Sequence, residues 1–124
     1  MAKDLNINVL LYFYGGLLTD RKREFLEYYY NDDMSLGEIA EISGISRQGV
    51  RDAIKRAEET LTDAERRLGF ARKDAILRAK LGEISDCAEK IRNENYRGSL
   101  SKTINDLTVQ IQSICGDLAD SDQT

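Results

Sequence analysis

The chain of 124 residues has no proline, no histidine and only two cysteines, and each shortage excludes a class of structure or chemistry. Without proline, no residue forces a helix to break, and the helical periodicities described below favour an all-α fold. Without histidine, the commonest general base and the mixed Cys/His zinc sites are missing. Because nucleophile motifs and phosphate-binding glycine loops are absent too, we predict a protein that is no enzyme and needs no cofactor or metal.

The two cysteines and the most apolar stretch favour a cytoplasmic location. Cys87 and Cys115 lie far apart and outside any metal-binding spacing, which is typical of reduced thiols in the cytosol. The apolar run VLLYFYGGLL, residues 9–18, is too short to span a bilayer and lacks the basic flank and the cleavage site of a signal peptide. We therefore expect no membrane segment.

Positive charge is in short supply over the whole chain. Its 18 basic and 22 acidic residues give a net charge of −4, which excludes a non-specific nucleic-acid coat and a polybasic membrane patch. The length suits one or two small units with a modest core. Any nucleic-acid binding must therefore come from a local cationic surface.

The residues around which the chain is organised run from Ser35 to Leu61. Ser35 and Glu38 form an S-x-x-E capping box, which predicts a helix start. That helix should end at Gly44, because glycine tolerates the left-handed conformation, and Ser46 should cap the next one. The apolar residues of the first helix fall on one side of it, namely Leu36, Ile39, Ala40 and Ile42.

The second helix has an apolar seam with alternating spacings of four and three residues. The small Ala40, then Gly44 four residues later and the aliphatic Val50 form the steric pattern that lets two helices cross closely in a helix-turn-helix. The second helix of that motif enters the major groove of DNA. The seam consists of Val50, Ile54, Ala57, Leu61, Ala64 and Leu68.

The opposite face of this helix is our candidate nucleic-acid-binding site. From residue 47 to 56 it carries four basic residues and one acid, Asp52. The carboxylate of Asp52 weakens the case for binding, because it would repel phosphate. Arginine pairs with guanine and glutamine with adenine, so Arg47, Gln48 and Arg51 would lie at base edges. Lys55 and Arg56 would lie on phosphates. The alternatives are a merely solvated face or a protein-interaction module. The candidates are Arg47, Gln48, Arg51, Lys55 and Arg56.

Two helices should precede the motif. The first covers residues 4–14 and ends at Gly15, with Leu5, Val9, Tyr12 and Phe13 as its packing residues. The second runs from a cap at Thr19 or Asp20 to about Asn31, with Phe25, Leu26, Tyr29 and Tyr30 facing inward. The predicted core comprises Leu10, Phe13, Phe25, Leu26, Tyr29, Ile39, Ala40, Ile45, Val50 and Ile54.

Three basic residues, Arg21, Lys22 and Arg23, stand at the start of the second helix. Cations at a helix N-terminus oppose the macrodipole, so an external anion such as a phosphate is a candidate partner. The alternative is again a solvated face.

The C-terminal half contains two heptad-patterned helices separated by a break at residues 95–98. We expect a helix-turn-helix domain at 1–70, a helical hairpin or dimerisation extension at 71–119 and a disordered tail at 120–124. The apolar seams favour a homodimer; the alternative is a monomer whose seams fold back on residues 50–68. The seams are Leu77, Leu81, Ile84, Ala88 and Ile91, then Leu100, Ile104, Leu107, Ile111, Ile114 and Leu118.

Two strings carry a family resemblance: FYGGLLTDRKREFLEYYY at 13–30 and SLGEIAEISGISRQGVRDAIKR at 35–56. Together they resemble the YlxM-type helix-turn-helix family over residues 5–70. The resemblance implies a fold like region 4 of sigma factors and a cytosolic regulator linked to the signal recognition particle pathway, because the family's genes commonly neighbour that for the particle's protein. Two functions stay open: a DNA-binding regulator, or a non-catalytic accessory protein that binds the particle's RNA or protein component.

Overall fold

The computed structural model describes residues 3, 6–98 and 100–121, and within them the chain is all-α, as the sequence predicts. It divides into two compact units, Met1–Ala71 and Arg72–Thr124. None of the helices in these described ranges combines the length and apolar character needed to cross a bilayer. The elements are α1 (Ile7–Tyr14), a 3-10 turn (Gly15–Leu17), α2 (Asp20–Leu26), a π-helical turn (Glu27–Asn31), α3 (Leu36–Ser43), α4 (Arg47–Leu68), α5 (Phe70–Arg97) and α6 (Lys102–Ser121).

Local capping residues fix where the helices of the first unit begin. The hydroxyl of Thr19 accepts from the Lys22 N–H at the start of α2. Ser35 and Glu38 form the expected capping box, with the Glu38 N–H donating to Ser35 Oγ at 3.1 Å. Ser46 Oγ accepts from the backbone N–H of the third residue of α4 at 3.0 Å. These predicted helix starts are confirmed.

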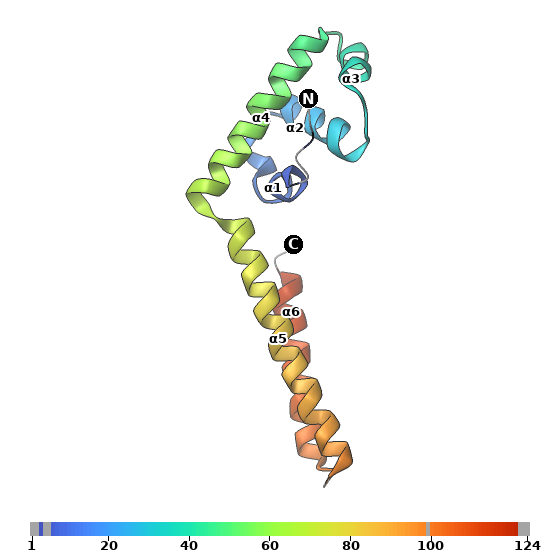
Figure 1. The fold of residues 1–124 in the computed structure, drawn as a ribbon, viewed down its shortest axis with the longest axis vertical. Helices are drawn as coiled ribbons and strands as arrows, with labels where there is room; N and C mark the ends of the chain where they lie inside the picture. The colour runs from blue at the N-terminus through green and yellow to red at the C-terminus, as the bar shows by residue number, and fades with distance from the viewer. Residues whose placement is uncertain (1–2, 4–5, 99, 122–124) are drawn as a thin grey trace. The chain divides into compact units, whose positions relative to one another are not determined.

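Helix α4 is the centre of the first unit, and α1, α2 and α3 pack against it (Figure 1). The predicted seam of α4 is buried from Val50 to Ala64, whereas Leu68 is 44% exposed. Most of the predicted core is buried, and Phe13, Ala40 and Ile45 pack against it half-buried. Further core residues are Ile7, Tyr14, Leu18, Ala57 and Leu61.

Two expected faces are wrong. Val9 and Tyr12 are 50% and 59% exposed, and α1 instead buries Ile7, Leu10 and Tyr14. Asn8 is the one polar residue of α1, so hydropathy gives only a weak signal for its buried face. Ile42, expected on the same side of its helix as the buried Ile39, is 64% exposed near the end of α3. The expected packing residue Leu5 lies outside the described residues.

Tyrosine hydroxyls connect α1 and the π-helical turn to α4. Tyr30 donates to Glu58 Oε1 at 2.6 Å, and Tyr14 donates to Glu65 Oε1 at 2.7 Å. The Phe70 N–H in turn donates to the Tyr14 hydroxyl at 3.0 Å, just after Gly69 ends α4 in the left-handed conformation (φ +67°). Burial, and then the hydrogen bond to Glu65, raise the pKa of Tyr14 above its ordinary value of 10.0. All residues of this cluster lie within the first unit, which ends at Ala71.

In the second unit, α5 and α6 lie side by side as an antiparallel hairpin (Figure 1). Side-chain hydrogen bonds set its register: Arg92 Nη1 donates to Gln112 Oε1 at 2.6 Å, and Gln112 Nε2 donates to the Ser85 carbonyl at 3.2 Å. Near the turn, Asn95 and the Ser101 backbone exchange hydrogen bonds of 2.7 and 2.8 Å. Apart from Leu81, the buried positions of this hairpin are therefore small or polar.

The hairpin does not bury the expected apolar seam. Leu81 and Ala88 are covered, but the other seam residues are 37–60% exposed. The buried residues of α6 come one position later than the predicted ones, because the hydrogen bonds and small side chains select a different face. The exposed members are Leu77, Ile84 and Ile91 of α5 and Leu100, Ile104, Leu107, Ile111, Ile114 and Leu118 at α6. The tail expected at 120–124 is helical to Ser121, and its last three residues lie outside the described part.

Candidate nucleic-acid interface

The turn between α3 and α4 is built from short-range contacts. Gly44 takes the left-handed conformation at φ +74°, and its N–H donates to the Ala40 carbonyl at 2.9 Å. The Ser43 hydroxyl donates to the carbonyl of Ile39, whose side chain is fully buried. The chain then enters α4 through the Ser46 cap. This geometry is that of a helix-turn-helix, and it leaves the first turns of α4 accessible.

The candidate residues share the side of α4 away from its buried seam. Arg47, Gln48, Lys55 and Arg56 are exposed, and Arg51 is half-buried. Positions 47, 51 and 55 recur every four residues, which places them in one row of the helix surface. The structure therefore brings the predicted residues of α4 together along its N-terminal half.

Arg47 lies against the first turn of α3. A Cβ atom added at Gly37 would lie 2.9 Å from both Nε and Nη2 of Arg47, closer than real contacts allow. Gly37 therefore makes the space in which the guanidinium group rests. Sequence reasoning missed this contact, because a glycine in the first turn of a helix has no local signature of its tertiary neighbour.

Gln48 and Arg51 are both constrained. The Gln48 amide donates from Nε2 to Asp52 Oδ1 at 2.9 Å, so the one carboxylate of this face holds the predicted adenine reader. The Nε of Arg51 is buried and has no hydrogen-bond partner among the described residues. The Nε end of the Arg51 guanidinium group is therefore shielded from water, although the residue as a whole is only half-buried.

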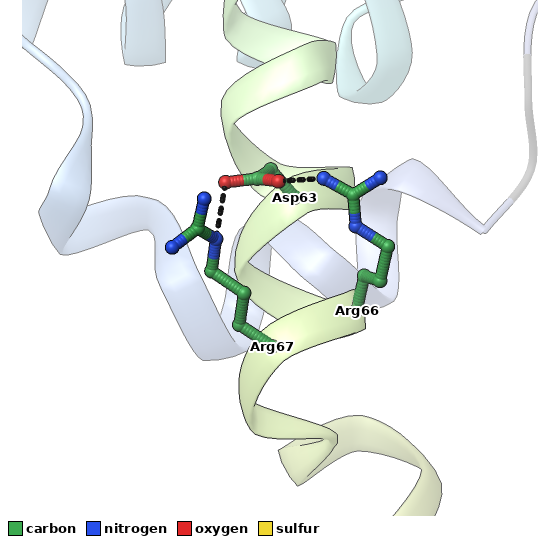
Figure 2. A network of polar contacts seen from close by, with 3 residues as sticks. All are labelled: Asp63, Arg66 and Arg67. Carbon is green, nitrogen blue, oxygen red and sulfur yellow. Dashed lines mark hydrogen bonds and ion pairs between the residues drawn. The ribbon is translucent and has the colours of Figure 1, made fainter.

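The cationic row ends where carboxylates begin. Lys55 lines a shallow groove on α4 together with Glu58, Glu59, Asp63 and Arg66, so the charges of the following turns are mixed. Farther along, Figure 2 shows Asp63 between two arginines: Arg66 bonds one carboxylate oxygen, and Arg67 Nε donates to the other at 2.9 Å. The hydrogen bond from Arg66 holds the pKa of Asp63 below its ordinary value of 3.8. Positive charge at this end of α4 is therefore partly compensated.

The basic residues at the start of α2 behave differently from one another. Arg23 forms an ion pair with Asp20 at 3.2 Å, and the Arg21 guanidinium lies over the Phe25 ring, 5.4 Å from its centroid. Arg21 also lines a hollow with Ser43 at the end of α3. Lys22 is half-buried beside them. The structure thus brings Arg21 to the helix-turn-helix, while Arg23 is neutralised on its own helix.

Comparison with known proteins identifies relatives over most of the chain. Residues 1–105 match the model of the UPF0122 family, described as "Putative helix-turn-helix protein, YlxM / p13 like". A UPF0122 protein of Thermoanaerobacter sp. (strain X514) is 42% identical over 115 residues, covering 92% of this chain and 98% of the relative. One from Caldanaerobacter subterraneus subsp. tengcongensis is 51% identical over 88 residues, covering 70% and 75%. A third, from Streptococcus thermophilus, is 44% identical over 96 residues, covering 77% and 84%.

Proposed function

The chain belongs to the UPF0122 family of helix-turn-helix proteins, and from this premise we propose that it is a DNA-binding regulatory protein of the cytoplasm. The observation that carries the proposal is the cationic N-terminal half of α4, exposed directly after a capped helix-turn-helix turn. A second helix placed in this way is the element that enters the major groove. The likeness to sigma factor region 4 stays a prediction.

In this proposal, the residues nearest the turn read bases. Arg47 can leave its place over Gly37 by rotating a flexible side chain, and Arg51 and Gln48 follow on the same face. Gln48 reads adenine only after its amide leaves Asp52, so the free protein holds this reader in a closed arrangement. Asp52 would then be free to accept from a cytosine amino group.

Phosphate contacts come from residues at the edges of the same surface. Lys55 and Arg56 are exposed one turn farther along α4, and Arg21 and Lys22 supply charge beside the end of α3. Arg23 contributes less because Asp20 already pairs with it. Because the whole chain has a net charge of −4, binding must depend on this local surface and therefore on salt.

A second candidate function is that of a non-catalytic accessory protein of the signal recognition particle, bound to its RNA or its protein component. The hydrogen bond between Gln48 and Asp52 favours it, since that contact reduces base reading while Arg47, Lys55 and Arg56 still suit the phosphates of a structured RNA. For either function we propose a homodimer formed through residues 71–119, with a helix-turn-helix domain at 1–70.

Fluorescence polarisation separates the two functions. Labelled mixed-sequence duplex DNA, the particle's RNA and its purified protein component are each titrated with the full chain at several salt concentrations. We expect the DNA to bind most tightly and the affinity to fall steeply with salt, because each neutralised phosphate releases counterions. Tighter binding to the RNA, or salt-independent binding to the protein, would replace the DNA-binding proposal with the second one.

A further inference from the structure

The hairpin of α5 and α6 has two unlike faces. In both helices, the residue before a buried or half-buried position is often aliphatic and exposed. On α5 these residues are Leu77, Ile84 and Ile91, at 44–50% exposure. On α6 they are Ile104, Leu107, Ile111, Ile114 and Leu118, at 37–52% exposure. We call this set the apolar face.

Both rows emerge on the same side of the hairpin. One residue back along a helix corresponds to a rotation of about 100°. Because α5 and α6 run in opposite directions, that rotation has opposite senses in the two helices when both are viewed from one end, and both rows turn to the same side. Ile91 and Ile104, which line one hollow, join the rows near the hairpin turn.

The other side of the hairpin is polar and acidic. Residues that follow a buried or half-buried position include Asp86 and Glu89 on α5 and Asp106 and Asp120 on α6, all exposed. The large apolar residues at such positions are Val109, 49% exposed, and Tyr96, 61% exposed. The hairpin is therefore a two-helix layer with one face suited to water and one that is not.

The apolar face supplies about half of the area that a standard protein–protein interface buries. Burial of the remaining exposed half of its aliphatic side chains removes on the order of 400 Å² of apolar surface per copy. Two copies would bury about twice that area, roughly half of a standard interface of about 1,600 Å², before any flanking polar residue is counted. Single exposed aliphatic residues are ordinary, but a contiguous face of this size marks a contact.

We propose that the apolar face binds the same face of a second copy, with the two-fold axis running across the helices, so that α5 packs antiparallel on α5 and α6 on α6. The inference rests on the homodimer proposed above and gives it a face, an orientation and a register. The assembly is a four-helix bundle in which each layer is one hairpin.

Charge selects this orientation over the alternative. The α5 row continues the heptad with Lys80 toward the N-terminal end and Glu94 toward the C-terminal end, both exposed and paired only with neighbours on their own helix. A crosswise axis places Lys80 of one copy beside Glu94 of the second copy. An axis along the helices would place both charges against the aliphatic row of α6, which leaves them desolvated and unpaired.

One axis position satisfies both helices. Gln112 reaches Arg92 and the Ser85 carbonyl, so it stands level with about residue 88 of α5. An axis at that level places Ile84 opposite Ile91 of the second copy. On α6 the same axis places Ile111 opposite Ile114 and Leu107 opposite Leu118 of the second copy. It also places the exposed Cys87 of each copy close to its equivalent, whereas Cys115 is buried in the hairpin.

Sedimentation equilibrium of the full chain tests the face. We expect a dimer at tens of micromolar, a monomer for Ile114→Glu, and a dimer for Val109→Glu, which changes a residue of similar exposure on the opposite side. Circular dichroism checks that both variants keep their helicity. A monomeric parent, or equal behaviour of the two variants, would overturn the proposal.

Cross-linking tests the orientation separately. A short bis-maleimide should join two copies through Cys87, and Cys87→Ser should abolish the product. Lys80→Glu should weaken the dimer at least tenfold, and adding Glu94→Lys should restore it. A dimer without the Cys87 product, or without restoration, rejects the crosswise axis and leaves the homodimer standing. All of these measurements omit nucleic acid, so their failure says nothing against DNA binding.

Discussion

Gly37 and Arg47 show how a residue with no side chain contributes to the candidate interface. The arginine that would read DNA rests where a Cβ of residue 37 would lie. The contact is reversible because it involves the far end of a flexible side chain. In the proposed complex, DNA would compete for the side chain of Arg47.

Replacing Gly37 with alanine should separate stability from binding. Alanine favours a helix by about 0.5–1 kcal/mol over glycine, so thermal stability should be unchanged or higher. The displaced Arg47 should change DNA affinity severalfold. The control is Gly82→Ala in α5, where no neighbouring side chain lies within 4 Å of the added Cβ. This variant should gain the same thermal stability without a change in DNA affinity. A Gly37→Ala variant with unaltered DNA affinity would dismiss the contact.

Tyr14 gives the stability a dependence on alkaline pH. Its pKa is raised in the folded state above 10.0, so the folded protein retains a proton that the unfolded chain loses. The contribution of Tyr14 to the free energy of unfolding should therefore be fully present below pH 10. It should be lost as the pH rises through the folded-state pKa. Urea titrations at increasing pH measure this slope.

The matching variant is Tyr14→Phe. It leaves Glu65 and the Phe70 N–H without the hydroxyl, which should cost about 1–3 kcal/mol at neutral pH and flatten the alkaline slope. Tyr96→Phe, at a 61% exposed site, should change neither quantity. An alkaline slope that persists in Tyr14→Phe would assign it to another group.

At the scale of elements, the crossing of α3 and α4 depends on Ala40, which packs half-buried against the core. Ala40→Leu should overpack the crossing and cost about 1–3 kcal/mol. For a unit of this size the thermal midpoint should fall by about 4–8 °C per kcal/mol. Glu41→Leu places the same side chain at the exposed neighbouring position and should leave the midpoint nearly unchanged. No difference between the two variants would reject the proposed crossing.

Local signals predicted the elements better than their packing. The Ser35 capping box, the Gly44 turn and the Ser46 cap depend on neighbours within a few residues, and all are present. The buried face of α1 was not predicted, because Asn8 is the one polar residue that distinguishes the sides of that helix. The heptads of α6 predicted a helix correctly but not its contact with α5, because polar side chains such as Gln112 set that contact and hydropathy does not record them.

The candidate site was predictable to the same extent. Spacing alone placed Arg47, Gln48 and Lys55 on one face of α4. The Gln48–Asp52 hydrogen bond follows from a separation of four residues and could have been anticipated. The contact of Arg47 with Gly37 joins two helices, so it needed the structure.

At the scale of the whole molecule, dimerisation and DNA binding should be coupled. If two copies present two copies of α4, both domains can bind one palindromic site, and the second contact becomes intramolecular. Ile114→Glu should then weaken binding to a palindromic duplex by at least tenfold and leave binding to an isolated half-site unchanged. Val109→Glu should leave both affinities unchanged. Equal affinities of the parent and Ile114→Glu for the palindrome would uncouple the two activities.

The most direct test of the central claim compares two double variants that each remove two positive charges from α4. Arg47→Ala with Arg51→Ala alters the proposed reading face; Arg66→Ala with Arg67→Ala alters the two arginines that pair with Asp63 (Figure 2). Fluorescence polarisation on a selected duplex should show a loss of at least tenfold for the first pair, because each base contact contributes about 1–3 kcal/mol. The second pair should stay within about twofold of the parent. Equal binding by all three proteins, or equal losses in both variants, would contradict a reading face at the start of α4.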